Sequence, residues 1–246
     1  ILTSTTSLLI ATPIHAFEII SAEDINSGGD GTIASLDRTK NAETEFLNKL
    51  TTNIGTEDFE AYSWETSANL NLSFPGAGTA TLGGNGRVYC IEHIEGVTDA
   101  NTIDIELNNG RYASSGTNYW HTSATVGDSS TFMIDLTEEI AAFGFYAYDL
   151  GDFGGELEIK LYQDGEIVTT ISNTSHRLYT STVDGAYTGS AVYIGIIGEQ
   201  KDDGTYETFD QVEFVIANMA GSAEDFFAFD DMTIATPQQL LKVYAD

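Results

Sequence analysis

The chain has 246 residues, of which 38 are acidic and 9 are basic, so its formal net charge is −29 at pH 7. A surface this anionic repels nucleic acid and anionic lipid, so we exclude both as partners, and it attracts cations instead. No apolar segment approaches the about 20 residues that a membrane-spanning helix requires, so we also expect no membrane insertion.

Residues 1–16 have the features of the end of a secretory signal peptide. An apolar stretch, Leu8–Ala11, is followed by Pro13 and then by Ala16, a small residue at a suitable cleavage position. This segment predicts a secreted protein. In an alternative interpretation, the Thr-rich segment Ile1–Ala22 is an exchanged strand that completes the sheet of a neighbouring copy, as in fibre subunits.

Residues 17–57 are predicted to form an N-terminal extension. It contains a short strand, Phe17–Ala22, and one helix over residues 41–52. Asn41 suits the N-cap position, acidic residues occupy the first turn, and the apolar stripe that includes Phe46 is expected to pack against the main domain.

From residue 58 onwards, short segments with strand character are separated by turn residues. The predicted strands are 59–64, 70–74, 79–82, 87–91, 103–107, 119–123, 131–136, 142–148, 157–162, 167–171, 191–197, 211–216 and 226–234. About a dozen strands at short spacing, without alternating helices, predict an all-β jelly-roll β-sandwich over residues 58–235. Residues 236–246 are predicted to form a C-terminal tail.

A glycine-rich acidic loop follows the buried strand 142–148. Asp149 and Asp152 lie in it and form one candidate Ca²⁺ site, since Ca²⁺ prefers carboxylate and carbonyl oxygens. The alternative is a turn that the two Asp side chains cap without a metal.

Four segments share a pattern with a known group of proteins. They are Asp58-Phe59-Glu60, Ser115–Trp120, Phe143–Asp152 and Phe227–Ile234. Together they resemble the jelly-roll domain of bacterial exosortase-associated (PEP-CTERM-type) surface proteins, and more distantly MAM-like and carbohydrate-binding jelly rolls. The resemblance implies a secreted surface protein. The Pro-Glu-Pro motif with which this family usually ends is not found in this sequence, so anchoring by that route does not follow.

The resemblance also implies a second Ca²⁺ site. In the related jelly rolls the first and last strands lie side by side and matching residues hold a structural Ca²⁺, which here places Asp58 and Glu60 near Asp230 and Asp231. Because neighbouring side chains of a strand point to opposite faces, Asp230 and Asp231 are not expected to point into the core together. The alternative is that these carboxylates accept hydrogen bonds from turn amides.

Glycan binding requires exposed aromatic side chains flanked by polar groups. The run Asn118, Tyr119, Trp120 and His121 provides such a setting, and Trp64 is a further candidate. The alternative is that both tryptophans belong to the core.

Catalysis finds little support in the sequence. The histidines are scattered without the spacing of a zinc site or a catalytic triad, and Asp104 and Glu106 stand too close for paired catalytic carboxylates. The sequence therefore favours a non-catalytic secreted surface or extracellular-matrix protein stabilised by Ca²⁺. The alternatives are a carbohydrate-binding module, a fibre subunit that assembles by strand exchange, and a glycosidase; the expected partners are glycans or copies of the chain itself.

Overall fold

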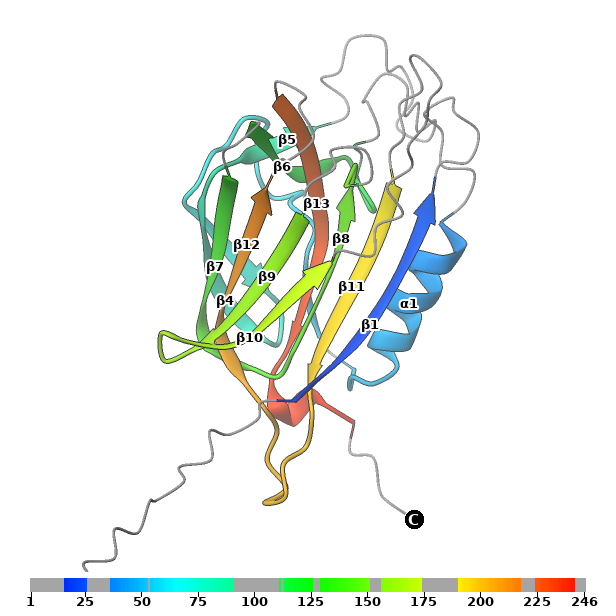
Figure 1. Cartoon of the computed structure of the whole chain (residues 1–246), viewed down its shortest axis with the longest axis vertical. Helices are drawn as coiled ribbons and strands as arrows, with labels where there is room; N and C mark the ends of the chain where they lie inside the picture. The colour runs from blue at the N-terminus through cyan, green and yellow to red at the C-terminus, as the bar shows by residue number, and fades with distance from the viewer. Residues whose placement is uncertain are drawn as a thin grey trace, which may run out of the picture.

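The computed structural model describes residues 16–25, 36–52, 54–90, 111, 113–125, 129–150, 156–173, 190–217 and 224–241. They form two antiparallel sheets packed face to face, with one helix on the outer face of one sheet (Figure 1). The elements in chain order are β1 (Phe17–Ile25), α1 (Asp37–Leu47), β2 (Gly55–Glu57), β3 (Leu70–Phe74), β4 (Gly78–Gly84), β5 (Arg87–Cys90), β6 (Asn118–Thr125), β7 (Ser129–Ile140), β8 (Ala142–Tyr148), β9 (Glu156–Gln163), β10 (Glu166–Asn173), β11 (Ser190–Gly198), β12 (Phe209–Ala217), β13 (Glu224–Ala235) and a 3-10 helix (Pro237–Gln239).

The strand order is that of a jelly roll. The seven-stranded sheet has the order β1-β11-β8-β13-β6-β5, with β2 also paired to β13, and the six-stranded sheet has the order β10-β9-β12-β7-β4-β3. Strands β6 to β13 therefore lie as β6-β13-β8-β11 in one sheet and β7-β12-β9-β10 in the other, which is the jelly-roll winding. The predicted fold class, an all-β jelly-roll sandwich, is confirmed. None of the helices described is long and apolar enough to cross a membrane.

Most predicted strands are present within a few residues of their expected bounds, but the segment 59–64 is a turn. Glu57 accepts a hydrogen bond from the Phe59 N–H at 2.9 Å, and Asp58 accepts one from the Glu60 N–H at 3.2 Å. Phe59 has a φ of 58°, in the left-handed region. Local bonds from acidic side chains to the backbone thus replace the expected strand. The predicted strand 103–107 lies outside the described residues.

The helix begins earlier than the sequence pattern indicates, at Asp37 rather than at 41, and it ends at Leu47. The predicted cap, Asn41, therefore lies inside the helix. The first-turn N–H groups are instead satisfied by Asp24 of β1, which accepts hydrogen bonds from the N–H and hydroxyl of Thr39 at 2.8 Å each and from the N–H of Arg38 at 3.3 Å. Because the capping residue lies on a distant strand, the sequence near the start of the helix gives no indication of it.

Residues 17–57, expected as an extension, contribute directly to the sandwich. Strand β1 pairs with β11 along its whole length, from Phe17 opposite Gly198 to Ile25 opposite Ser190. The strand-exchange alternative expected residues 1–22 to pair with another copy, whereas residues 17–22 pair within their own chain. Residues 1–15 lie outside the described part.

The main core lies between the sheets and is rich in phenylalanine. The rings of Phe132 and Phe214 are stacked with their centres 4.3 Å apart, and Phe229 meets both edge-on at 4.9 and 5.4 Å. Strand β8 is buried at every position, which means that both of its faces are covered. One face contributes to this core, and the other lies beneath α1.

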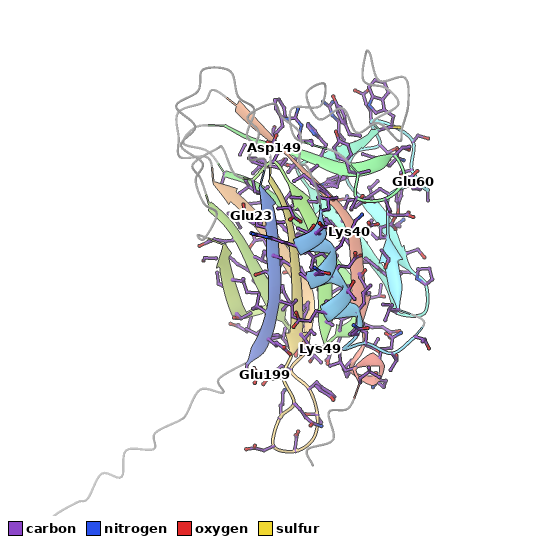
Figure 2. All side chains as sticks on the ribbon, turned by 90° about the vertical axis from the view of Figure 1, so that its right-hand side faces the viewer. Glu23, Lys40, Lys49, Glu60, Asp149 and Glu199 are labelled. Carbon is purple, nitrogen blue, oxygen red and sulfur yellow. The ribbon has the colours of Figure 1, made fainter. Side chains whose placement is uncertain are left out.

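A pair of glycines seats α1 on the seven-stranded sheet. Gly144 of β8 and Gly195 of β11 are paired across the strands. A Cβ atom at Gly195 would lie 2.5 Å from the ring of Phe46, and one at Gly144 would lie 2.8 Å from it. The glycines therefore leave the space that the Phe46 ring fills, and α1 lies across the outer face of the sheet (Figure 2).

Candidate functional site

Four of the predicted metal ligands meet where β2 joins β13. Glu57 of β2 lies opposite Met232 of β13, so the turn after β2, with Asp58 and Glu60, comes close to Asp230 and Asp231. We call these four acids the acidic junction. The resemblance placed these acids together through a first strand at 59–64, whereas here the turn after β2 brings them beside β13.

The carboxylates of the acidic junction bind the segment 114–118 that precedes and begins β6. Glu60 accepts hydrogen bonds from the N–H groups of Thr117 and Asn118 at 2.6 Å each. Asp230 accepts the Ser114 N–H at 2.7 Å and the Ser114 hydroxyl at 2.9 Å. The junction therefore ties together parts of the chain that are far apart in the sequence.

A bulge in β13 lets Asp230 and Asp231, which are adjacent in the sequence, both contact the segment 114–118. The pairing of β13 with β8 shifts register between Asp230 and Thr233, and Asp231 has a φ of 46°. As a result Asp231 accepts a hydrogen bond from the Ser115 hydroxyl at 2.7 Å, next to the bonds that Asp230 makes. Asp231 is half-buried, so the two side chains do not point into the core together, and the bulge lets both reach the same segment.

Negative charge at the acidic junction is only partly compensated. Asp230 is completely buried, and its Oδ1 atom has no hydrogen-bond partner within the described residues. Burial raises the pKa of Asp230 well above its usual value, and the nearby charge of Asp231 adds to this. The pKa of Asp231 is raised as well, first by burial and then by the charges of Asp58 and Glu60.

Among the residues that the structure describes, no three His, Cys, Asp or Glu side chains are arranged to hold a metal ion. At the acidic junction the oxygens of Glu60 and Asp231 are engaged by N–H and hydroxyl groups instead. This is the hydrogen-bonded alternative that the sequence left open. A Ca²⁺ ion at the junction stays a prediction.

The second candidate pair is described only in part. Asp149 is buried, has a φ of 66° and lies 3.7 Å from the guanidinium of Arg111. Asp152 falls outside the described residues. Asp149 and Glu60 both lie toward the same end of the sandwich (Figure 2).

Two predicted sugar platforms, Tyr119 and Trp120, are completely buried and present no ring face to a ligand. Trp120 stacks on Phe59 with ring centres 6.4 Å apart in the main core, while Tyr119 packs on the opposite face of β6. The physical reason is that β6 lies between β5 and β13 and is buried along residues 118–122.

Asn118 is buried too, and its side-chain amide donates hydrogen bonds to the backbone carbonyls of Phe59 and Tyr62 at 3.0 Å each. Its role in the structure is to hold the turn that follows β2. Trp64 differs, because 41% of its surface is exposed.

A groove beside β5, β6 and β13 contains the fifth candidate, His121. Its cavity volume is about 440 Å³, and its lining residues are Ser67, Asn85, Gly86, Arg87, His121, Thr122, Ser123 and Phe226. The ring of His121 lies 4.4 Å from that of Tyr89 and 5.3 Å from that of Phe226, to which it is nearly parallel. We call this the aromatic groove. Trp64 lies at its side, in edge contact with Tyr89 at 6.5 Å.

No local sequence pattern marks Arg87, Tyr89 or Phe226 as site residues. Alternation along β5 does place Arg87 and Tyr89 on one face, but only the strand pairing shows that this face meets His121 and Phe226. Burial, followed by the charges of Arg111 and Arg87, lowers the pKa of His121 to about 3. The ring is therefore neutral at physiological pH.

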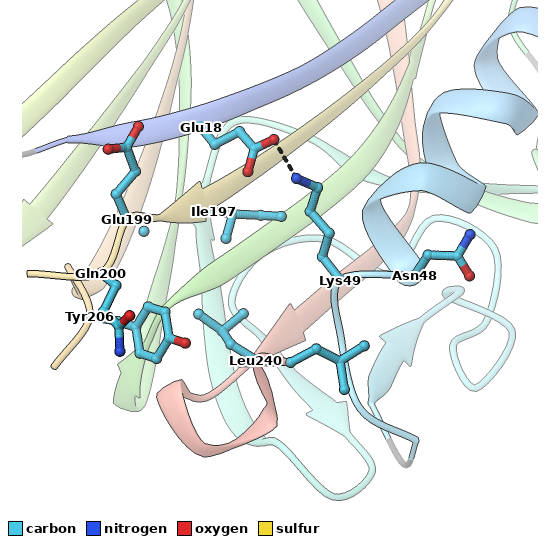
Figure 3. Close-up of a pocket in the computed structure, with 10 residues that line it drawn as sticks. Glu18, Asn48, Lys49, Ile197, Glu199, Gln200, Tyr206 and Leu240 are labelled. Carbon is cyan, nitrogen blue, oxygen red and sulfur yellow. Dashed lines mark hydrogen bonds and ion pairs between the residues drawn. The ribbon is translucent and has the colours of Figure 1, made fainter. Parts of the chain in front are cut away.

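A second pocket lies at the other end of the sandwich, between the start of β1, the end of α1 and the residues after β13 (Figure 3). Its volume is about 340 Å³, and it combines apolar side chains, Ile197, Leu240 and Leu241, with an ion pair between Lys49 and Glu18. No sequence signal pointed to it.

No protein-family model and no curated protein matches the sequence. Similar solved structures include the K2 cleaved adhesin domain of Lys-gingipain, which is 13% identical, with 74% of this chain and 98% of that chain covered and a TM-score of 0.42. The module CBM27-1 of Caldicellulosiruptor saccharolyticus, solved with mannohexaose, is 10% identical, with 75% and 98% covered and a TM-score of 0.40. The family 11 carbohydrate-binding module of Clostridium thermocellum is 11% identical, with 74% and 96% covered and a TM-score of 0.30. The jelly-roll topology itself is established by the strand order of this chain.

Proposed function

We propose that this chain is a non-catalytic ligand-binding β-sandwich of a secreted cell-surface or extracellular-matrix protein, and that its ligand is a glycan. The aromatic groove, with the 41% exposed Trp64 at its side, supports a glycan ligand. A sugar can stack the apolar face of its ring on an aromatic side chain while its hydroxyl groups hydrogen-bond to polar neighbours.

The groove lining supports binding over hydrolysis. Ser67, Asn85 and Ser123 provide polar groups, and no Asp or Glu is among the described residues that line the groove. Glycoside hydrolysis uses two carboxyl groups about 5–10 Å apart on either side of the scissile bond. A groove whose described lining residues include no such pair suits a binding module better than the glycosidase alternative.

Calorimetric titration with neutral oligosaccharides tests the proposal. We expect Trp64→Ala to weaken binding about tenfold, because it removes a stacking surface. Ile167→Ala is the matched control, since Ile167 is 53% exposed and lies on β10, at the edge of the other sheet. Failure of the wild-type chain to bind any member of a broad panel, or unchanged affinity in Trp64→Ala, would contradict glycan binding in this region.

We also propose that Ca²⁺ stabilises the fold at the acidic junction. The support is the buried Asp230 Oδ1 atom, which has no hydrogen-bond partner among the described residues, together with the neighbouring charges of Asp231, Asp58 and Glu60. Asp230 would hold the ion through Oδ1, and Asp231, Asp58 and Glu60 would join as further carboxylates by turning away from their present hydrogen bonds. A bound cation would relieve the repulsion between these charges.

Thermal unfolding with chelator and with added Ca²⁺ tests this second proposal. Saturation at 100 times the dissociation constant stabilises a protein by about 2.7 kcal/mol, which for a chain of this size raises the Tm by about 5–10 °C. We expect Asp230→Asn to fold but to lose the response, because an amide oxygen still accepts the Ser114 N–H. Asp203→Asn, at an exposed turn, is the control. The same Tm in chelator and in Ca²⁺ for the wild-type chain would refute the calcium site.

A further inference from the structure

Two arginines flank the aromatic groove, in a chain that has only 9 basic residues. The guanidinium carbon of Arg87 lies 5.3 Å from the ring centre of Tyr89, and that of Arg111 lies 5.0 Å from the ring centre of Phe226. Stacking on a ring covers the face of a guanidinium and leaves the N–H donors at its edge. Those donors suit the oxygens of a carboxylate or a sulfate.

The carboxylates beside these arginines lie too far away for hydrogen bonds. In these ion pairs Nη1 of Arg87 lies 3.6 Å from Oε1 of Glu65, and Nη1 of Arg111 lies 3.7 Å from Oδ2 of Asp149. Direct hydrogen bonds of this kind are about 2.7–3.2 Å long. These two acids therefore hold the arginines in place but compensate their positive charge only in part.

Two buried nitrogen atoms have no hydrogen-bond partner in the described part of the chain: Nδ1 of His121, which lines the groove, and Nε of Arg111, which stacks on Phe226 at its side. Leaving a buried polar group without a partner costs about 1–3 kcal/mol. The His121 ring is held between Tyr89 and Phe226, and in the tautomer with hydrogen on Nδ1 it is a neutral donor. Each nitrogen atom has less than 1 Å² of exposed surface, so a ligand oxygen would pair with it where the side chains above it move aside.

We infer that the aromatic groove binds the oxyanion of an acidic sugar, a carboxylate or a sulfate, with Arg87, Arg111 and Nδ1 of His121 as its donors. This inference rests on the proposed glycan-binding function and names the class of glycan. The net charge of −29 opposes densely charged polymers, so a sugar with isolated oxyanions fits the groove better than a polyphosphate chain.

The test compares three trisaccharides of the same linkage that differ at carbon 6 of the sugar: galactotriose, its 6-sulfated form and trigalacturonate. Calorimetric titration is carried out in about 0.15 M NaCl, where distant charges are screened. We expect at least one acidic trisaccharide to bind about tenfold more tightly than galactotriose, a difference of about 1.4 kcal/mol. Whether the sulfate or the carboxylate is preferred distinguishes the two sources of the oxyanion.

Arg87→Gln is the decisive variant, because the Arg87 side chain is 44% exposed and its loss should not unfold the chain. It is expected to weaken the binding of the acidic trisaccharides much more than that of galactotriose, and so to bring the acidic and neutral affinities together. Lys201→Gln removes a positive charge from the hairpin at the other end of the sandwich and serves as the control.

The outcomes separate this inference from the proposed function. Equal affinity for the three trisaccharides, or an acidic preference that survives Arg87→Gln, overturns the inference. Neutral binding that is lost in Trp64→Ala would in that case still support glycan binding. No binding of any of the three overturns the inference and counts against the proposed function.

Discussion

His121 shows how one side chain in the aromatic groove links ligand binding to stability. Burial and two arginines keep its ring neutral, with a pKa of about 3 in the folded chain, whereas an unfolded histidine has a pKa of about 6.5. The folded state thus takes up its proton at much lower pH than the unfolded state. The stability that this difference contributes is present above about pH 6.5 and is lost as the pH falls toward 3.

A pH series on His121→Gln tests this point. Between pH 7 and pH 5.5 we expect the wild-type chain to lose about 1 kcal/mol of unfolding free energy relative to the variant, because only its unfolded state gains the His121 proton. Urea unfolding at both pH values measures the difference, and NMR titration follows the ring directly. A His121 ring that titrates near pH 6.5 in the folded chain would contradict the expectation.

At the scale of elements, α1 is held by shape as well as by apolar area. The ring of Phe46 is completely buried over the glycine pair of β8 and β11, and Tyr146 donates a hydrogen bond from below to Glu43 of the helix at 2.8 Å. The glycines have a defined role here, since a methyl group at Gly195 would overlap the Phe46 ring. The helix is therefore part of the packing of the sheet.

Gly195→Ala is expected to destabilise the chain by about 1–3 kcal/mol, because it overpacks the space beneath Phe46. Phe46→Leu should relieve the clash, so the double variant should be more stable than the sum of the two single changes predicts. Gly83→Ala on β4 is the matched control, since its added Cβ would meet only the side-chain oxygen of Asn69, at 3.1 Å. Chemical unfolding of the four chains measures the coupling; additive effects would argue against the contact.

At the scale of the whole molecule, the sites are distributed between two ends. The acidic junction and the aromatic groove are both built around β6 and β13, while the pocket of Figure 3 lies at the other end. The net charge of −29 repels anions at long range. The arginines of the groove therefore attract an anionic ligand only at short distance. A chain of this charge can select an acidic ligand only where its few cations are concentrated.

Most of the fold could be predicted from the sequence, because period-two patterns and turn residues are local. Strands such as Ala142–Tyr148 and the hairpin at Asp164-Gly165 follow directly from them. The helix start could not be predicted, since Asp24 of β1 provides the cap. The turn at Phe59 was missed because acidic side chains bond to the backbone there in place of a strand partner.

The candidate site was predictable only in part. The convergence of Asp58 and Glu60 on Asp230 and Asp231 followed from the resemblance, but the bulge that turns both Asp side chains to one segment carries no sequence signal. For Trp120 the sequence left a sugar platform and a core position open, because an aromatic residue beside polar neighbours gives the same pattern in a central strand and in an edge strand. Only the sheet order distinguishes the two cases.

The position of β13 has a consequence for the way in which this chain reaches its folded state. Although β13 is the last strand in chain order, it lies between β6 and β8 and also pairs with β2. During synthesis or export from the N-terminus, β6 and β8 would each present an open edge until residues 224–235 emerge. Long-range pairing of this kind slows folding and leaves edges open to aggregation. Because β13 comes last in the chain, we expect the sheet to be completed late. The pairing of β13 with β2, β6 and β8 also brings the acids of the acidic junction together.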